Sequence, residues 1–404
     1  MKIVVLKFGG TSVGTVDRIK KVANIIVGYS KKGFNVIVVS SAMGGATNDL
    51  IKKSRNISNN FNFSEYDVLV AAGEQISCAL IAGRLNHIGY KSRSWMSWQI
   101  PIVTEGEHSS SRISKINKKK ILNYLKSGGI PVVTGFQGIN NNNRITTLGR
   151  GGSDASAIMC AKFFKAKKCV IFTDVEGVYT TDPNKLENAK KIKAISYEEM
   201  LEMASLGAKV MQPHSIQDAR LNRIEIDVKS SFVNREGTSI TKRNNIFRNR
   251  TITGLTSTKN DAKITIVGVK DKPGVAASVF KPLSQNYINV DMVVQTSSSN
   301  NRETDITFTI KTDDLKRTTK LIKQNKKIKY RDLIVNNNVS KVSIIGVGMV
   351  TTPGVTYRMF QTLANKGINI LVIATSEIKI SVLINKKDIK KALSALHNEF
   401  RLNS

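Results

Sequence analysis

The sequence predicts an α/β protein with a largely parallel sheet, followed by a smaller unit that occurs twice. Over residues 1–245, short β-branched apolar runs alternate with longer segments that have helical apolar spacing. The apolar runs end in glycine-containing turns, and residues 263–404 repeat one pattern of strands and helices. Alternating strands and helices build a mainly parallel sheet with helices on both faces. We therefore expect an α/β/α sandwich followed by the two copies.

The strands of the first part are separated by helical segments. "KIVVLKF" precedes the helical stretch "TVDRIKKVANIIVGYS", and "NVIVVSSAMGG" precedes "EYDVLVAAGEQISCALIAGRLNHIG". "IPVVTGFQG" and "KKCVIFTDVEGVY" are further patterns of buried strands. Ligands of such sheets bind beyond the carboxyl ends of the strands. Because the glycine turns fall at that end, we expect them to form one site.

The second part contains two related copies. "ITIVGVKDKPGVAASVFKPLSQNYINVDMVVQ" and "VSIIGVGMVTTPGVTYRMFQTLANKGINILVIA" both run strand, Pro-Gly-Val turn, helix, Ile-Asn, strand. Each copy continues with a strand and a helix, and "YRDLIVN" adds a last strand to the first copy. A lone strand at 251–258 can fill the corresponding gap in the second copy, which would interleave the two. The predicted segments are 1–245, a linker over 246–262 with that strand, 263–338 and 339–404.

The chain is strongly basic, with 62 Lys and Arg residues against 30 Asp and Glu residues and a formal charge of +32. Such a balance can indicate nucleic acid, an anionic membrane or an acidic ligand as partner. The lysines are spread along the chain among many Asn and Ile residues, and no RNA-recognition or Cys/His finger pattern accompanies them. This pattern favours a composition bias, so we expect neither nucleic acid nor a membrane as partner.

The cysteines and the apolar runs indicate the compartment. Cys78, Cys160 and Cys169 have no metal-ligand spacing, and their low, odd number fits a reducing environment. The four histidines form no metal-binding pair. The apolar run before Lys7 is too short for a signal peptide, and no stretch approaches the roughly 18 unbroken apolar residues of a membrane helix. We expect a cytoplasmic protein without a metal site of its own.

The first candidate site is the turn "KFGGTS", directly after the first strand. The backbone N–H groups of Gly9 and Gly10 can point at phosphate oxygens, and Lys7 offers a mobile positive charge. The turn is not a Walker A loop, because no Lys-Ser/Thr pair follows a glycine at the required spacing. The alternative interpretation is a tight turn with a solvated lysine.

The second candidate site is "TTLGRGGSDASA", which precedes a helical run of small residues. Arg150 can grip a carboxylate with two parallel hydrogen bonds, and the start of a helix attracts anions. The alternative is that Ser153 or Asp154 only caps the helix after a glycine turn. A cap requires neither the arginine nor the additional glycines, so we favour a binding site.

Three further segments offer polar groups. The loop "FTDVEGVYTTDP" is either a polar turn or presents hydroxyl and carboxylate groups to a nucleotide. "AAGEQIS" places Glu74 at a helix start, where a carboxylate suits the helix dipole or binds an ammonium group. Ser41 and Thr47 flank a glycine pair and serve either a ligand or the turn alone.

Together these segments resemble one protein family. "KFGGTSVG", "VVSSAMG", "AAGEQIS", "GFQG", "TTLGRGGSD", "FTDVEGVYTTDP" and "KPGVAASVF…NYINVDMVVQ" occur in the order found in aspartate kinases (aspartokinases). The resemblance covers essentially the whole chain, and "GRGGSD" with "TDVEGVYT" after "KFGGTSVG" is close to diagnostic. It implies an amino-acid-kinase-type α/β/α sandwich and two ferredoxin-like βαββαβ (ACT) domains, as in the monofunctional members.

The resemblance implies ATP-dependent phosphorylation of the β-carboxylate of L-aspartate to 4-phospho-L-aspartate, the first step toward lysine, threonine and methionine. The implied cofactors are ATP and Mg²⁺. Phosphoryl transfer requires positioning and charge neutralisation more than covalent chemistry. The nucleophile would be the substrate's own carboxylate, which is ionised at neutral pH, so no general base is required.

The family's roles fall on matching residues of this chain. Lys7 would balance the charge on the transferred group, and Asp154 would orient the lysine. Arg150 would hold the α-carboxylate of aspartate and Glu74 its ammonium group. Three hydroxyl residues would complete the aspartate pocket: Ser41, Thr47 and Ser153. The implied nucleotide-binding residues are Lys7, Phe8, Gly9, Gly10, Thr173, Asp174, Tyr179, Thr180, Thr181, Asp182, Pro183, Asn184 and Lys209.

ACT domains usually bind a small amino acid, so the resemblance implies feedback by lysine, threonine or both and a homo-oligomer formed through these domains. The implied effector-binding residues are Asp271, Pro273, Gly274, Val275, Ala276, Asn289, Asp291 and Met292. Alternatively, the pair of domains serves oligomerisation only, and its Pro-Gly turns punctuate helices. Two other functions stay open for the chain: a related kinase with another acceptor such as glutamate, and a non-catalytic amino-acid sensor.

Overall fold

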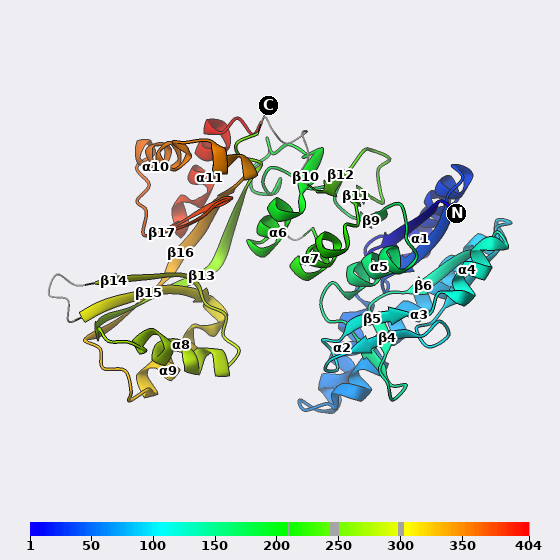
Figure 1. Cartoon of the computed structure of the whole chain (residues 1–404), viewed down its shortest axis with the longest axis horizontal. Helices are drawn as coiled ribbons and strands as arrows, with labels where there is room; N and C mark the ends of the chain where they lie inside the picture. Colours follow the sequence, from blue (N-terminus) through cyan, green and yellow to red (C-terminus); the bar gives the residue numbers. More distant parts are fainter. Residues whose placement is uncertain (209, 243–249, 298–302, 404) are drawn as a thin grey trace. The chain divides into compact units, whose positions relative to one another are not determined.

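The first strand lies inside a large, mainly parallel sheet of the computed structural model (Figure 1). Residues 1–208, 210–242, 250–297 and 303–403 are described, and among them eight strands form this sheet in the order β10-β12-β11-β9-β1-β2-β6-β3. The pair β11–β12 is antiparallel, and the other pairs are parallel. The strands are β1 (Ile3–Phe8), β2 (Asn35–Ser40), β3 (Ser92–Trp95), β6 (Ile130–Thr134), β9 (Cys169–Thr173), β10 (Ala194–Ser196), β11 (Ile226–Ser230) and β12 (Thr238–Thr241).

Helices cover both faces of this sheet. Its central strands are therefore buried on both sides, which explains why their residues are apolar at successive positions. Val4, Leu6 and Phe8 of β1 pack with apolar residues of α1 and α3. The alternate residues of β1 face the other side, where α5 lies against the strand. The helices are α1 (Val16–Lys31), α2 (Ala46–Ile57), α3 (Phe63–His87), α4 (Lys119–Lys126), α5 (Gly152–Phe163), α6 (Tyr197–Ser205) and α7 (Pro213–Asn222).

A second, smaller sheet was not predicted from the sequence. In the described residues it has the order β5-β4-β7-β8. Its strands are short: β4 (Ile102–Glu105), β5 (Arg112–Ile116), β7 (Gln137–Ile139) and β8 (Ile145–Thr147). Strands of three to five residues carry too little alternation to be recognised from an apolar pattern. This sheet leads directly into the glycine turn before α5.

Helix α3 is the central helix of this unit. By length and composition it could cross a membrane, and it is the one helix in the described residues that passes such a test. Half of its most apolar window is buried, and it packs against β2, β3, β6 and α1. It also carries the buried carboxylates of Asp67 and Glu74. These contacts identify α3 as a core helix.

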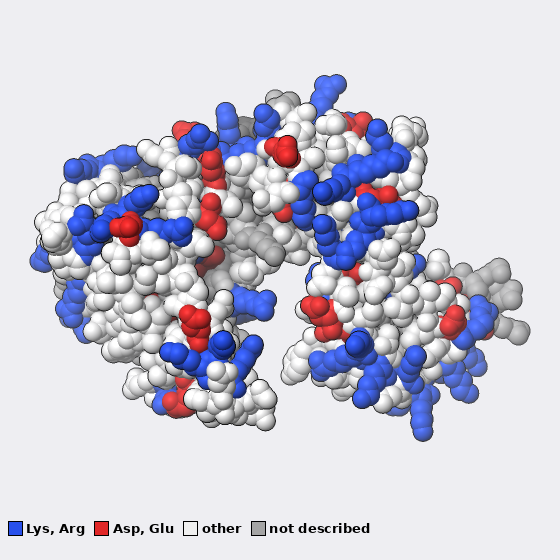
Figure 2. All heavy atoms as spheres, turned by 180° about the vertical axis from the view of Figure 1, so that it is seen from behind, with Lys and Arg blue, Asp and Glu red and all other residues white. Residues whose placement is uncertain are grey.

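The described residues divide into two compact units. The first unit comprises Met1–Val178, Lys191–Ser205 and Lys209–Ile246, and the second comprises Tyr179–Lys190, Leu206–Ala208 and Phe247–Ser404. The second unit therefore includes two segments that precede the predicted boundary at residue 245. Figure 2 shows Lys and Arg side chains scattered over the visible face of both units, with Asp and Glu side chains between them.

In the described part of the second unit, six antiparallel strands form one sheet in the order β14-β15-β13-β16-β18-β17. The strands are β13 (Gly254–Lys270), β14 (Asp291–Ser297), β15 (Glu303–Lys311), β16 (Asp332–Ile345), β17 (Val372–Ser376) and β18 (Lys379–Asn385). The helices are α8 (Val275–Gln285), α9 (Leu315–Gln324), α10 (Val355–Asn365) and α11 (Ile389–Glu399), with short 3₁₀ helices η2 (Thr312–Asp314), η3 (Val347–Thr351) and η4 (Lys386–Asp388).

Two long strands join the repeated copies. The first part of β13, Gly254 to Thr258, pairs with residues 341–345 of β16, and the second part pairs with residues 332–336. The strand expected alone at 251–258 thus begins at Gly254 and continues to Lys270. The polar run at 259–261 does not end it, because buried Asp261 is paired with Lys311 at 3.1 Å. The domain limits given above remain predictions.

Each copy has its own hydrophobic core. Val279 and Leu283 of α8 belong to the core of the first copy. Leu255 belongs to the core of the second copy, with apolar residues of α10 and α11, although it precedes the first copy in the sequence. The interleaved strands therefore link the folding of the second repeat to a segment far upstream of it.

Replacing Leu255 with Ala should loosen the second copy rather than the first. Leu255 is 1% exposed, and loss of a buried Leu side chain costs about 2–5 kcal/mol. In hydrogen–deuterium exchange we expect faster exchange in α10 and α11 and little change in α8 and α9. The matched control is Leu283→Ala, which should show the opposite pattern. Faster exchange in α8 and α9 of the Leu255 variant would contradict the interleaved arrangement.

Candidate active site

The end of β1 carries a buried lysine. Lys7 is 8% exposed, and its Nζ lies 2.6 Å from Oδ1 of Asp154, which is 7% exposed and belongs to the first turn of α5. A buried ion pair of this kind persists only where its geometry is good, because both charges lose their hydration. The pair therefore holds the first and second candidate turns together.

The neighbouring residues of the first turn differ from the prediction in two respects. The side chain of Phe8 is fully buried and stacks on Phe172, with ring centroids 4.8 Å apart, so only its backbone can face a ligand. The amide of Gly9 donates to the carbonyl of Phe172 at 3.1 Å. Of the two predicted phosphate-binding amides, only that of Gly10 has no hydrogen-bond partner within the described residues.

The turn after β2 lies against the turn after β1. A Cβ on Gly10 would lie 3.0 Å from the carbonyl oxygen of Ala42, and a Cβ on Gly44 would lie 3.3 Å from the carbonyl oxygen of Gly10. The amide of Ser41 donates to the carbonyl of Phe8 at 3.0 Å. The two glycines thus allow a close approach that side chains would prevent. Half-buried Thr47 follows in the first turn of α2.

Glu74 lies in the middle of α3, and the prediction that it stands at a helix start is wrong. The small residues "AAG" that suggested a turn serve packing instead, since a Cβ on Gly73 would lie 2.7 Å from Cβ of Ala42. Oε1 of Glu74 accepts the amide of Ala42 at 3.0 Å, while its buried Oε2 has no hydrogen-bond partner within the described residues. Burial raises the pKa of Glu74 to about 8.

The second turn begins α5 without a side-chain cap. Gly151, with a φ of 71°, is the N-cap residue, and neither Ser153 nor Asp154 caps the helix, so the capping alternative does not hold. A Cβ on Gly135 would lie 2.9 Å from Cβ of Ser153, which places Ser153 against the turn after β6. Arg150 is exposed just before the helix.

The end of β9 completes this group of turns. The Thr173 carbonyl accepts the amide of Ser231 at 2.9 Å, and the Ser231 hydroxyl donates to the Ser12 hydroxyl at 2.7 Å. The Thr173 hydroxyl donates to exposed Asp174 at 3.0 Å. Sequence reasoning missed Ser12 and Ser231. Both follow a strand at its carboxyl end, so the rule that located the other residues applied to them as well.

The rest of the predicted nucleotide loop belongs to the second unit. The Thr180 side chain contacts Nε2 of His397 on α11 at 3.0 Å, and its carbonyl accepts the amide of Leu255 at 2.6 Å. Thr180 and Thr181 are buried, and Tyr179 is half-buried. Asp182, Pro183 and Asn184 are exposed. The remaining predicted residue, Lys209, lies outside the described residues.

Carboxylates, histidines and cysteines do not gather into a metal centre in the described part of the chain, where no group of three could hold an ion. Cys78, Cys160 and Cys169 are all buried and unpaired with one another. Burial raises the pKa of Cys160 to about 12, so this thiol stays protonated.

The predicted effector residues differ in their surroundings. Gly274, with a φ of 88°, is the N-cap of α8, and Val275 is buried. Asp271 and Pro273 are exposed, and Ala276 is half-buried. Met292 is 5% exposed and packs with Val339, Val372 and Leu383, so it is a core residue.

Asp291 forms an ion pair with Lys341 of β16. Partial burial acts to raise the pKa of Asp291, but the hydrogen bond and charge of Lys341 lower it overall.

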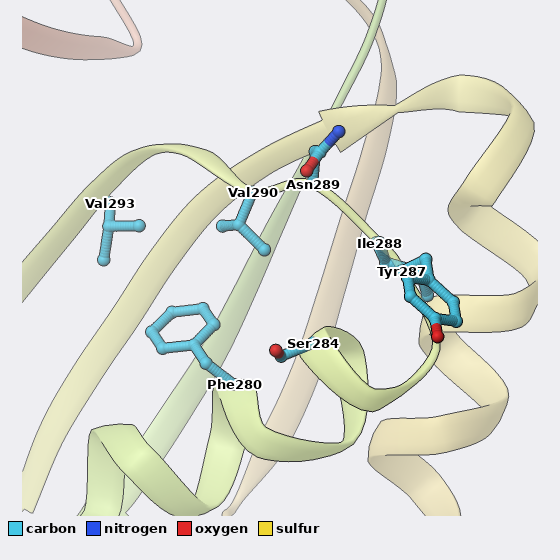
Figure 3. A pocket seen from close by; sticks show the side chains of 7 residues that line it. All are labelled: Phe280, Ser284, Tyr287, Ile288, Asn289, Val290 and Val293. Atoms are coloured by element: carbon cyan, nitrogen blue, oxygen red, sulfur yellow. The ribbon is translucent and has the colours of Figure 1, made fainter. Parts of the chain in front are cut away.

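A cavity of about 490 Å³ lies beside the end of α8 (Figure 3). Its lining residues are Phe280, Ser284, Tyr287, Ile288, Asn289, Val290 and Val293. Figure 3 shows Phe280 and Ser284 of α8 opposite Val290 and Val293. Among the described residues, Asn289 is the one predicted effector residue that lines it.

Comparisons with known proteins agree with this architecture. Residues 2–230 match the model of the amino acid kinase family, and residues 264–325 and 342–400 match that of the ACT domain. The aspartokinase of Bacillus sp. (strain MGA3) is 41% identical over 404 residues, which cover 100% of this chain and 98% of that protein.

Two solved structures of E. coli aspartokinase III have the same fold. The complex with aspartate and ADP (R-state) has a TM-score of 0.80 at 27% identity and covers 98% of this chain and 99% of that chain. The complex with lysine and aspartate (T-state) has a TM-score of 0.79 at 26% identity and covers 99% and 100%. The predicted fold class and resemblance are confirmed, and the chain belongs to the aspartokinase family.

Proposed function

We propose that this protein is an aspartate kinase that transfers the γ-phosphoryl group of ATP to the β-carboxylate of L-aspartate, giving 4-phospho-L-aspartate and ADP. The observation that carries the proposal is the buried Lys7–Asp154 pair, which joins the end of β1 to the start of α5. The aspartate and ADP bound to the E. coli relative support it. The reaction is the first step toward lysine, threonine and methionine.

Lys7 supplies the positive charge at the transferred phosphoryl group. Its ammonium stays beside Asp154, so it is oriented before substrate binds and needs little rearrangement in the transition state. The free amide of Gly10 binds a phosphate oxygen. A Mg²⁺ ion bound with the nucleotide would neutralise negative charge on the phosphates, beside the ammonium of Lys7 and the amide of Gly10.

The aspartate pocket lies at the turns after β2 and β8. The exposed guanidinium of Arg150 binds the α-carboxylate, and the free Oε2 of Glu74 binds the ammonium group. Ser41, Thr47 and Ser153 donate or accept the remaining hydrogen bonds. The β-carboxylate of the substrate is then left to attack phosphorus, and it is already ionised at neutral pH.

The second unit regulates this reaction by binding lysine, threonine or both. The lysine held by the T-state relative supports this assignment. The segment Tyr179–Lys190 belongs to the unit that contains the ACT domains, where the Thr180 side chain contacts His397. We further propose a homo-oligomer formed through the ACT domains and a cytoplasmic location.

The acceptor assay tests the proposed function directly. With ATP, Mg²⁺ and hydroxylamine, an acyl phosphate is trapped as a hydroxamate. We expect a hydroxamate with L-aspartate and none above background with L-glutamate, whose carboxylate lies one methylene further from the α-carbon.

The control for this assay is Lys7→Ala. Because its charge acts mainly in the transition state, the variant should lose roughly 100- to 1,000-fold in kcat with little change in the KM for aspartate. Turnover with glutamate but not aspartate would make the protein a kinase of another acceptor. ATP-independent binding of amino acids without turnover would make it a sensor.

The KM for aspartate should fall as pH rises. With a pKa of about 8, Glu74 is mostly protonated at pH 7 in the free protein, whereas the substrate's ammonium group requires the carboxylate. Binding at low pH therefore has to remove a proton first, and we expect a decrease of roughly tenfold in KM between pH 7 and 8.5. Steady-state kinetics at constant ionic strength measure it.

The matched variant is Glu74→Gln, which keeps the shape of the side chain but cannot ionise. It should show a higher KM that no longer changes over this pH range. If the slope persists in this variant, another group causes it and Glu74 does not bind the ammonium.

A further inference from the structure

One face of α3 holds three separate segments of the first unit. Asp67, Ala71 and Glu74 are spaced by four and three residues, so they lie on the same face of the helix. Glu74 accepts the amide of Ala42, and the carbonyl of Ala71 accepts Nε2 of Gln137 at 2.8 Å. Asp67, one further turn toward the start of the helix, holds the segment that leads to Arg150.

Asp67 is a fully buried carboxylate, and each of its two oxygens accepts hydrogen bonds from Ser109 and Thr147. Oδ2 accepts the amides of Ser109 and Thr147, each at 3.0 Å, and contacts Nδ1 of His108 at 2.8 Å. Oδ1 accepts the hydroxyls of Ser109 at 2.9 Å and Thr147 at 2.6 Å. A buried carboxylate is stable only when its lone pairs are satisfied in this way. Asp67 thereby joins the loop after β4 to the end of β8.

These bonds fix the backbone that leads to Arg150. Thr147 is the last residue of β8, three residues before Arg150. Gly149, with a φ of 73°, packs so closely on the same loop that a Cβ would lie 3.0 Å from the carbonyl of Ser109. The guanidinium of Arg150 has no hydrogen bond or ion pair within the described residues, so the backbone of the turn is what fixes the point from which the side chain extends.

We propose that Asp67 is a positioning residue for the α-carboxylate site of aspartate. It acts through Thr147 and Ser109, which hold the turn that presents Arg150, and it does not touch the substrate. The inference rests on the proposed role of Arg150. Asp67→Asn removes the charge and replaces one acceptor oxygen with an NH₂ group that faces other donors. The turn should then shift, which misplaces the guanidinium without disturbing Lys7.

The test uses the full-length chain and four variants: Asp67→Asn, Arg150→Ala, the double variant and Glu199→Gln. Asp67→Asn should raise the KM for aspartate roughly tenfold, with kcat and the KM for ATP changed less than about threefold. Arg150→Ala should raise the same KM roughly 10- to 100-fold. The double variant should resemble Arg150→Ala alone, because both changes act on one interaction.

Glu199→Gln is the matched control for stability. Glu199 is a buried carboxylate on α6 whose Oε2 accepts the amide and hydroxyl of Ser196 at 3.1 and 2.8 Å. The Glu199→Gln variant should have a lower Tm, as Asp67→Asn does, but an unchanged KM for aspartate. If Asp67→Asn does not fold, Thr147→Val removes one donor to the same carboxylate and should raise this KM about threefold.

The outcomes separate the two proposals. If Arg150→Ala leaves the KM for aspartate unchanged, the proposed pocket is wrong. If Arg150→Ala raises it but Asp67→Asn and Thr147→Val do not, the positioning role of Asp67 is wrong. The positioning role is equally overturned if the effects of Asp67→Asn and Arg150→Ala multiply in the double variant, or if Glu199→Gln raises the KM as much.

Discussion

The ion pair between Lys7 and Asp154 is the constraint on which the rest of the site depends. A buried ammonium and a buried carboxylate each cost several kcal/mol of hydration, and only their close contact offsets this cost. The pair lies 2.6 Å apart and joins β1 to α5, two elements separated by most of the first unit's sequence. Any fold that satisfies it must bring the turns "KFGGTS" and "GRGGSD" to one edge of the sheet. Phosphate and carboxylate groups of substrates can then meet there.

Helix α3 supplies the second constraint. Its buried polar groups form hydrogen bonds with the turn after β2, with strand β7 and with the end of β8. One helix therefore fixes the positions of three segments that are separate in the sequence. Ser77 adds to this, since its hydroxyl donates to the carbonyl of Ser41 at 2.7 Å. Buried networks of this kind are costly when half-satisfied and specific when complete. Oε2 of Glu74 has no such partner within the described residues, and it is the atom assigned to the substrate.

Much of this arrangement follows from the sequence, and the exceptions have physical causes. Glycine turns after apolar runs predicted a meeting of turns at one edge, because parallel strands share one carboxyl edge, and the Lys7–Asp154 pair joins two of these turns. The position of Glu74 was misjudged, since small residues favour turns locally but here allow α3 to approach Ala42. Phe8 and Met292 were assigned to ligands by the resemblance and Gly9 by its place in a glycine turn, whereas tertiary contacts occupy the two side chains and the Gly9 amide. The polar run at 259–261 suggested a break in what is a continuous strand, because the partner of its buried Asp261, Lys311, is distant in the sequence.

A crystal structure with L-aspartate, Mg²⁺ and a non-hydrolysable ATP analogue tests the central claim most directly. The account predicts the Lys7 ammonium within hydrogen-bond distance of the terminal phosphate while it remains paired with Asp154. It also predicts the α-carboxylate of aspartate on Arg150 and its ammonium group on Glu74. Nucleotide phosphates bound away from the end of β1 and the start of α5, or a Lys7 turned away from the phosphates, would contradict it.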